Sequence, residues 1–238
     1  MALKTNLVSY WKMEEASGSR VDVHGSNDLT DNNTVLNATG ISGNGADHER
    51  DTSEWLSIAH ASQTNLDVTT GDFSISCWIK RESTGIFGGL VGKIDSGDVG
   101  GYRLVFNSDN KLGFFIAETG GGTGSTDVAS TNTFASTTVW YHVVAVLSGL
   151  NMTLYVNNVS EGTGSKASDY SLTNTEAFGT GRYRSGGDAN YFDGIIDEVA
   201  FWNRAITTDE ISEIYNSGTG KFYNDWDLVT FIPFIMMS

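Results

Sequence analysis

The sequence predicts an all-β protein in which two layers of strands pack as a sandwich or close into a barrel. The 238-residue chain has 28 glycines and a single proline, and charged residues make up only 18% of it. Its apolar residues recur at every second position far more often than at helical spacing. No linker or internal repeat divides the chain, and its length suits one large β domain.

The clearest predicted strand covers residues 73–80. Phe73, Ile75, Cys77 and Ile79 share one face of it and alternate with a more polar face. Cys77 is the only cysteine, which excludes an internal disulfide, and its position predicts an unreactive core thiol. Further strands are predicted over residues 7–13, 55–58, 90–94, 102–106, 112–117, 140–147, 152–156, 178–179 and 195–202. Residues 16–46, 118–133 and 160–176 are predicted to be mainly loops.

One short helix is predicted near the C-terminus. Thr207 and Glu210 fit a capping box, in which each side chain bonds to the backbone of the other residue. Gly218 can end the helix. Its narrow apolar stripe consists of Ile211, Ile214 and Tyr215.

The chain is strongly acidic, with 29 acidic and 14 basic residues and a net charge of −15. This charge would repel nucleic acid and anionic membranes, whereas it favours solubility and hard cations such as calcium. No stretch of about 20 apolar residues is present, so membrane insertion is not expected. Residues 1–6 do not open a signal peptide. We expect a virion-surface or extracellular location that is reached without one.

The C-terminal residues differ from the rest of the chain. Residues 228–237 are apolar, too short to cross a bilayer, and prone to aggregate if left in water. We therefore divide the chain into a domain over residues 1–222 and a hydrophobic tail over residues 223–238. The tail is expected to dock under the sandwich, against a partner or against a second copy in a homo-oligomer. Alternatively, it is a last core segment of the same chain.

Two adjacent carboxylates, Asp197 and Glu198, stand in the middle of an apolar strand. Buried carboxylates are costly unless they are paired, hydrogen-bonded or bound to a metal. Because Arg204 follows closely in the sequence, an internal ion pair between Glu198 and Arg204 is the favoured expectation.

A series of short stretches follows in an order typical of one family. They are residues 7–15, 22–28, 43–46, 56–58, 71–80, 140–145, 154–158, 191–206 and 207–215. Over residues 7–216 this order resembles the laminin G-like, concanavalin A-like domains. The resemblance implies a jelly-roll β-sandwich of two antiparallel sheets, with ligands on loops at a sheet edge or on a concave face. Such domains occur in lectins, carbohydrate-binding modules, glycosidase accessory domains, adhesion proteins and phage appendages, and many hold calcium.

The resemblance also implies a calcium site. Asp22 and Asn27 match positions that supply metal ligands in some relatives, and Asp197 is a candidate third ligand. The first and last strands often lie side by side in this architecture, which would bring the two segments together. The alternative is that Asp22 caps a turn and that Asp197 or Glu198 pairs with Arg204.

A sugar site needs an exposed aromatic ring with polar neighbours. Tyr183, Tyr191 and Trp78 are candidate platforms, and Asp188 lies in the same polar loop as Tyr183. Pentraxin-like relatives hold calcium with acidic residues near this loop, whereas here arginines stand at 182 and 184. The alternative is that these aromatic residues belong to the core or are scattered over the surface.

The sequence predicts no catalytic residues. The Glu-x-Asp-x-x-Glu strand of related glucanases is missing, and the four histidines form no zinc pattern. We expect a non-catalytic binding or structural module, directed at carbohydrate and displayed on a phage particle as a decoration, fibre or tail protein. A purely structural virion protein that contacts only other virion proteins is the alternative, and a glycoside hydrolase is less favoured.

Overall fold

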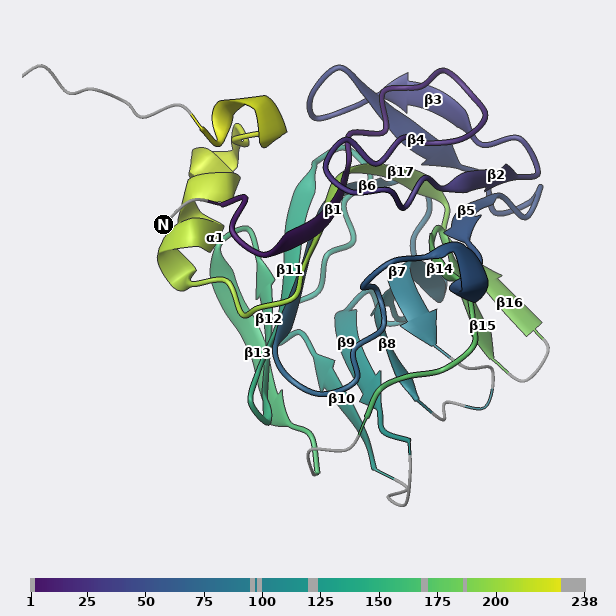
Figure 1. Cartoon of the computed structure of the whole chain (residues 1–238). Helices are drawn as coiled ribbons and strands as arrows, with labels where there is room; N and C mark the ends of the chain where they lie inside the picture. Colours follow the sequence, from purple (N-terminus) through teal and green to yellow (C-terminus); the bar gives the residue numbers. More distant parts are fainter. Residues whose placement is uncertain are drawn as a thin grey trace, which may run out of the picture.

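The alternating strands pair into two large antiparallel sheets in the computed structural model of the chain (Figure 1). The structure describes residues 3–94, 97, 100–119, 124–167, 171–185 and 188–227. Within these ranges, one sheet has eight strands, in the order β13-β12-β11-β6-β17-β4-β3 with β1 also paired to β17. The other has seven, in the order β10-β9-β8-β7-β14-β5-β2, and β15 and β16 form a separate hairpin. The predicted β-sandwich with one short helix is confirmed.

The eight-stranded sheet consists of β1 (Leu7–Trp11), β3 (Leu36–Thr39), β4 (Asn44–His48), β6 (Phe73–Arg81), β11 (Tyr141–Ser148), β12 (Asn151–Val156), β13 (Val159–Ser165) and β17 (Gly194–Trp202). The seven-stranded sheet consists of β2 (Thr30–Asn32), β5 (Trp55–Ile58), β7 (Gly88–Ile94), β8 (Gly101–Phe106), β9 (Leu112–Ala117), β10 (Ser125–Ala129) and β14 (Phe178–Thr180). The hairpin is made by β15 (Arg182–Ser185) and β16 (Asp188–Tyr191). The helix is α1 (Thr208–Tyr215), and short 3-10 turns cover His60–Ser62, Asn216–Gly218 and Tyr223–Asp225.

The main core lies between the two large sheets. Trp11 of β1 stacks across the two sheets on Phe178 of β14, at 5.2 Å between ring centroids. Phe73 stacks on Phe201 within the eight-stranded sheet, at 5.8 Å. Cys77 is fully buried in this core, and burial raises the pKa of its thiol to about 12. The prediction of an unreactive core thiol is therefore confirmed.

A second apolar cluster covers the outer side of the eight-stranded sheet. Ile211 and Ile214 of α1 pack there with Trp202 of β17. The capping box is present as predicted: the Thr207 side chain accepts from the Glu210 N–H, and Glu210 accepts from the Thr207 N–H. The helix ends at Asn216, which adopts a left-handed φ of 45° that asparagine tolerates. Because β17 is packed on both faces, all nine of its residues are buried.

The start of the predicted tail packs on the same chain. The rings of Tyr223 and Trp226 lie 5.0 and 4.9 Å from the ring of Tyr10. The predicted docking of residues 228–238 lies outside the described residues. Among the described residues, no helix is long and apolar enough to cross a membrane.

Three segments that the sequence predicts to be loops contain strands. Residues 16–46 include β2, β3 and part of β4, residues 118–133 include β10, and residues 160–176 include most of β13. Four of these five strands, β2, β3, β10 and β13, stand at the outer ends of the sheets. Their position explains why the sequence pattern is weak there, because an outermost strand has one neighbour and buries little side-chain surface.

Candidate functional site

The acidic pair in β17 is stabilised by hydrogen bonds. Asp197 accepts from the backbone N–H groups of Ile41 at 2.9 Å and Ser42 at 3.3 Å, and from that of Glu198 at 2.8 Å. Glu198 adopts a φ of 49°, at a register irregularity in the pairing of β17 with β6. Its carboxylate accepts a hydrogen bond from the Tyr10 hydroxyl on the neighbouring strand β1.

The predicted ion pair between Glu198 and Arg204 is wrong. Arg204 instead forms a bidentate ion pair with Glu210, in which each of two guanidinium nitrogens donates to one carboxylate oxygen at 2.7 Å. The physical reason is local: the left-handed backbone at Glu198 belongs to a bulge in β17 where the carboxylate meets Tyr10, whereas Arg204 lies after the strand, next to the helix cap.

The surroundings of Glu198 predict a pH-dependent stability. Burial raises the pKa of Glu198 to about 7 from 4.5, although the Tyr10 hydrogen bond acts in the opposite direction. Because the folded-state pKa is the higher one, the contribution of Glu198 to stability is complete below about pH 4.5 and is lost as the pH rises through about 7. Asp197 shifts in the same sense, since burial and the charge of Glu198 raise its pKa to about 9.

We therefore expect the free energy of unfolding of Glu198→Gln to fall by about 2 kcal/mol less between pH 5 and pH 8 than that of the native chain. Glutamine cannot ionise but still offers Tyr10 an oxygen. Urea unfolding at each pH measures the difference. Asp51→Asn is the matched control, because Asp51 is exposed. Parallel curves for the native chain and Glu198→Gln would contradict the expectation.

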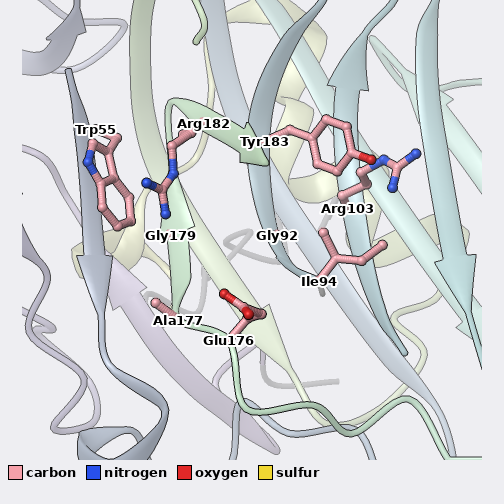
Figure 2. Close-up of a pocket in the computed structure, with 9 residues that line it drawn as sticks. All are labelled: Trp55, Gly92, Ile94, Arg103, Glu176, Ala177, Gly179, Arg182 and Tyr183. Atoms are coloured by element: carbon pink, nitrogen blue, oxygen red, sulfur yellow. The ribbon is translucent and has the colours of Figure 1, made fainter. Parts of the chain in front are cut away.

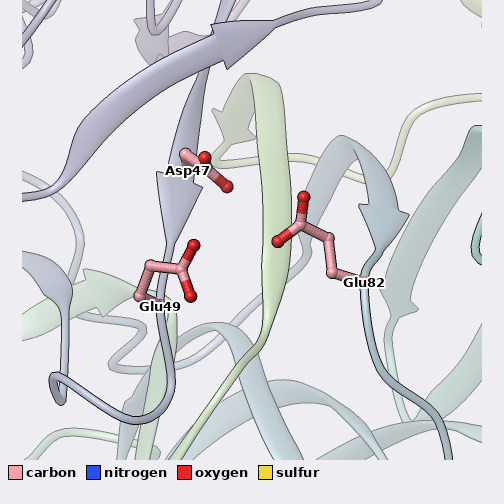
Figure 3. A group of neighbouring side chains, drawn as sticks. All are labelled: Asp47, Glu49 and Glu82. Carbon is pink, nitrogen blue, oxygen red and sulfur yellow. The ribbon is translucent and has the colours of Figure 1, made fainter.

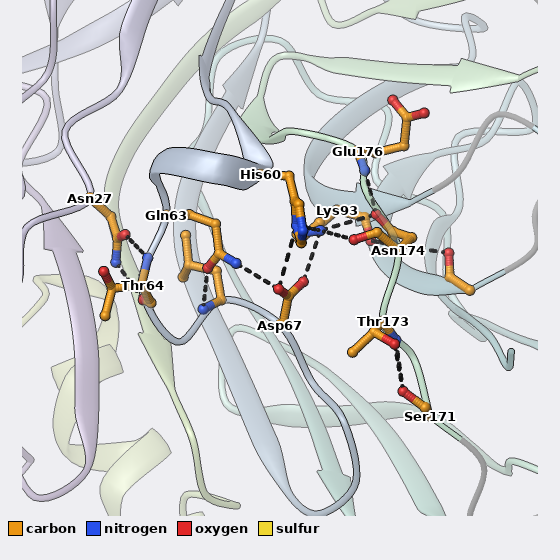
Figure 4. A network of polar contacts seen from close by, with 12 residues as sticks. Asn27, His60, Gln63, Thr64, Asp67, Lys93, Ser171, Thr173, Asn174 and Glu176 are labelled. Carbon is orange, nitrogen blue, oxygen red and sulfur yellow. Dashed lines mark hydrogen bonds and ion pairs between the residues drawn. The ribbon is translucent and has the colours of Figure 1, made fainter.

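The loop that carries Asp22 and Asn27 is organised around the Asp22 carboxylate. One oxygen, Oδ1, accepts from the backbone N–H groups of Tyr10, His24 and Gly25 at 2.8–3.0 Å. The other, Oδ2, accepts from the Asn27 N–H at 3.0 Å. Asn27 is itself buried, and its amide joins this loop to the backbone of Thr64, as Figure 4 shows.

The three predicted calcium ligands are only partly brought together. Asp22 and Asn27 lie in contact, and β1 runs beside β17 as expected, with Trp11 opposite Val199. Asp197, however, faces the backbone at residues 41–42. The carboxylate oxygens of Asp22 and Asp197 and the Asn27 Oδ1 all accept bonds from N–H groups. Calcium at these residues would have to replace such bonds, and it stays a prediction.

A different group of carboxylates lies close enough to share a cation. One oxygen each from Asp47, Glu49 and Glu82 lies within 4.8 Å of the others (Figure 3). Burial and the neighbouring negative charges raise the pKa of all three carboxyl groups. Glu49 and Glu82 are exposed. These carboxylates could supply oxygen ligands to a hard cation.

The predicted ligand residues Tyr183, Asp188 and Tyr191 belong to a single hairpin, β15–β16, which packs beside β7. Tyr183 is only 5% exposed, so little of its ring is open to a ligand. Tyr191 is half-buried and lines a small recess with Phe192. Trp78 is 2% exposed and stacks on His142, so it belongs to the covered face of the eight-stranded sheet and offers no platform.

The hairpin forms one wall of a shallow recess on the outer face of the seven-stranded sheet. Figure 2 shows Trp55 and Arg182 on one side and Tyr183 and Arg103 on the other. The remaining lining residues are Gly92, Ile94, Glu176, Ala177 and Gly179. The cavity volume is about 30 Å³, so a ligand would lie across the recess and would not be enclosed by it.

Two glycines make the floor of this recess flat. A Cβ atom at Gly92 would lie 2.8 Å from the Tyr102 carbonyl oxygen, and one at Gly179 would lie 2.4 Å from the Leu56 carbonyl oxygen. No side chain fits at either position without moving the backbone. Glycine inside a strand often marks a place where a ligand or another chain segment approaches closely.

The end of the recess is fixed by a buried lysine. Lys93 is 1% exposed, forms an ion pair with Asp67 at 2.9 Å, and donates to the Asn174 carbonyl at 2.8 Å (Figure 4). Asn174 in turn accepts from the Glu176 N–H at 2.9 Å. This network holds the segment that leads into β14 and places Glu176 at the recess.

Each arginine of the recess lies on an aromatic ring. The Arg182 Cζ is 3.2 Å from the Trp55 ring centroid, and the Arg103 Cζ is 3.7 Å from that of Phe115 and 4.0 Å from that of Tyr183. Sequence reasoning found Tyr183 but missed Trp55, Arg103 and Arg182 as members of one site. The available signal was the alternation in β8, where Arg103 interrupts a run of apolar residues.

The two-sheet antiparallel sandwich is the architecture of lectin-like domains. Residues 51–212 match the model of the concanavalin A-like lectin/glucanases superfamily, and the chain belongs to this family. No curated protein matches the chain.

Solved structures share the fold at low sequence identity. The binding domain of the Paraclostridial Mosquitocidal Protein 1 is similar at a TM-score of 0.72 and 20% identity, over 91% of this chain and 53% of that one. Domain 4 of AbnA, an extracellular arabinanase from Geobacillus stearothermophilus, was solved with arabinotriose. It is similar at a TM-score of 0.66 and 16% identity, over 91% of this chain and 98% of that one. The binding domain of Botulinum neurotoxin DC in complex with SialylT is similar at a TM-score of 0.66 and 14% identity, over 90% of this chain and 52% of that one. The chain thus spans about half of the toxin binding domains.

Proposed function

We propose that this chain is a non-catalytic carbohydrate-binding module whose ligand lies across the recess on the seven-stranded sheet. The observation that carries the proposal is the recess itself: a flat glycine floor between the rings of Trp55 and Tyr183, with guanidinium groups beside both rings. A shallow surface bordered by aromatic side chains, with a few placed polar groups, is suited to recognising sugars.

The lining residues also support binding without catalysis. Glycoside hydrolysis needs two carboxyl groups on either side of the bond, about 5–9.5 Å apart. Among the described residues that line the recess, Glu176 supplies the only carboxylate. A sugar lying there would be held but would meet no second acid.

The similarity to domain 4 of AbnA supports the proposal in a limited way. That domain is matched over nearly its whole length and was solved with arabinotriose. The similarity concerns the fold alone, so the ligand of this chain is inferred from its own recess. The predicted virion setting, calcium and a homo-oligomer through residues 223–238 stay predictions made from the sequence.

A broad glycan array tests the proposal, with and without a calcium chelator. We expect Trp55→Ala to weaken binding to any glycan found by about tenfold or more, because the ring that lines the recess and supports the Arg182 guanidinium group is lost. Trp55→Phe keeps an aromatic face and serves as the control, with thermal unfolding to confirm that both variants fold. A silent array would favour the purely structural alternative. Loss of binding on chelation would support the calcium prediction.

A further inference from the structure

A buried lysine amine lies among three other functional groups where β7 meets the segment that leads into β14 (Figure 4). The Lys93 Nζ is 2.9 Å from the Asp67 Oδ1 and 3.1 Å from the Asn174 Oδ1. The His60 Nδ1 lies 3.3 Å from the same nitrogen. Lys93 is only 1% exposed, so a carboxylate, a carboxamide and an imidazole surround an amine that water barely reaches.

An amine, a carboxamide and a carboxylate are the groups that a cross-link between two side chains needs. An isopeptide bond forms when a neutral amine attacks the carbonyl carbon of a carboxamide. In water this reaction does not proceed measurably, because the amine is protonated and a carboxamide is a weak electrophile. A folded chain can overcome both obstacles by holding the two groups in contact and by placing a proton acceptor beside the amine.

The surroundings of Lys93 favour the neutral amine. Burial lowers the pKa of Lys93, although Asp67 acts in the opposite direction. Moving a proton from the ammonium group to the Asp67 carboxylate turns two charged groups into two neutral ones, which reduces the cost of burying the amine. The Asp67 side chain is 25% exposed, so it can exchange this proton with water.

Asn174 is held in an orientation that suits the attack. Its Nδ2 donates to the carbonyl oxygens of Lys93 at 3.2 Å and of Gly100 at 3.1 Å, which fixes the plane of the amide. Its Oδ1 accepts from the Glu176 N–H at 2.9 Å. Attack at Cγ places negative charge on Oδ1, and this backbone N–H already points at that atom and stabilises the charge.

We propose that Lys93 and Asn174 become joined by an isopeptide bond, with Asp67 carrying the protons. Asp67 accepts a proton from the Lys93 ammonium group, and the neutral Nζ then attacks the Asn174 Cγ. The bond between Nζ and Cγ forms, and the bond between Cγ and Nδ2 breaks. Of the three protons that Nζ first holds, one stays on the new amide and two pass by way of Asp67 to the departing nitrogen. Ammonium therefore leaves, and no other reactant is consumed.

The hydrogen bonds favour Asn174 over Asp67 as the acyl partner of Lys93. Both side chains contact the amine, but an ionised carboxylate is a poorer electrophile than a carboxamide. Among the described residues, the Asp67 Oδ2 accepts from the Gln63 side chain, and no backbone N–H donates to this carboxylate. Of the two acyl groups, that of Asn174 therefore has the backbone donor ready for the developing charge.

The cross-link would join neighbouring strands of the seven-stranded sheet. Lys93 belongs to β7, and Asn174 stands 81 residues later, just before β14, which pairs with β7. A covalent bond between distant residues restricts the unfolded chain and so stabilises the fold, as a disulfide does. The single cysteine rules out a disulfide within the chain. The inference does not depend on the proposed function, because the bond forms whether or not a sugar lies in the recess.

Intact mass spectrometry of the purified, denatured chain tests the proposal. The native chain is expected to be lighter than its sequence by the mass of one ammonia molecule, and peptide mapping is expected to place Lys93 and Asn174 in one branched fragment. Lys93→Arg and Asp67→Asn are each expected to keep the full mass of their sequences, with circular dichroism to confirm that they fold. Asn174→Asp is expected to form the same bond with loss of water instead. Glu176→Ala is the matched control, because it keeps the backbone N–H and should form the bond.

The native chain decides the proposal by itself. A full sequence mass, unchanged after prolonged incubation at neutral pH, overturns it. So does an ammonia loss without a branched fragment, as ring closure at Asn44 before Gly45 would give. Loss of water with Asp67 in the branched fragment overturns the choice of Asn174. Bond formation in a folded Asp67→Asn variant overturns the role of Asp67.

Discussion

Replacing Asp22 with alanine is expected to destabilise the folded chain by about 3–5 kcal/mol, because four backbone N–H groups lose their shared acceptor. Two of the donors, Tyr10 and Asn27, are buried and have no direct access to water. Tyr10 belongs to β1, so the loss should also loosen the pairing of β1 with β17. Urea unfolding, monitored by tryptophan fluorescence, measures the change.

Asp28→Ala is the matched control for this prediction. Asp28 lies in the same loop, is exposed, and accepts one backbone bond, from the Asp22 N–H at 2.8 Å. We expect it to cost about 1 kcal/mol. Equal costs for Asp22→Ala and Asp28→Ala would refute the account. If calcium holds the loop instead, a chelator should destabilise the native chain as much as Asp22→Ala does.

The second large effect is expected at the junction between β17 and α1. Arg204→Met should destabilise the chain by about 3–5 kcal/mol, because it leaves the carboxylate of Glu210, 2% exposed, without its charged partner. Arg204 also donates to the Thr5 carbonyl at 2.8 Å, so the N-terminal segment loses a contact. Circular dichroism during chemical unfolding records the loss.

A double variant isolates the unpaired charge as the cause. Glu210→Gln keeps an oxygen for the Thr207 N–H and so preserves the capping box, but it removes the negative charge. Arg204→Met combined with Glu210→Gln should therefore be more stable than Arg204→Met alone. If the two effects simply add, the cost comes from lost packing and the explanation fails.

Much of the fold could be predicted because the buried strands carry a strong period. In β6, alternate residues from Phe73 to Ile79 enter the core, and β11 pairs with it along seven positions. The outermost strands could not be predicted this way. β13, with the sequence VSEGTGS, buries a single residue, and only its pairing with β12 makes it a strand.

The candidate site was predictable only in part. Tyr183 could be found because it stands in a polar loop with aromatic and charged neighbours. Trp55 and Arg103 are far from it in the sequence, and they line the same recess because β5, β14, β7 and β8 are adjacent in the seven-stranded sheet. No local pattern encodes that strand order.

The sequence by itself determined the all-β class, the buried thiol of Cys77 and the capped helix, because each depends on residue types that are close together in the chain. Tertiary structure alone decided that Glu198 meets Tyr10, that Arg204 meets Glu210, and that Trp55 lies under Arg182. The physical reason is that hydrogen bonds, ion pairs and ring stacking act over a few ångströms. Which charged and aromatic groups come that close depends on strand order, on register and on the bulge in β17.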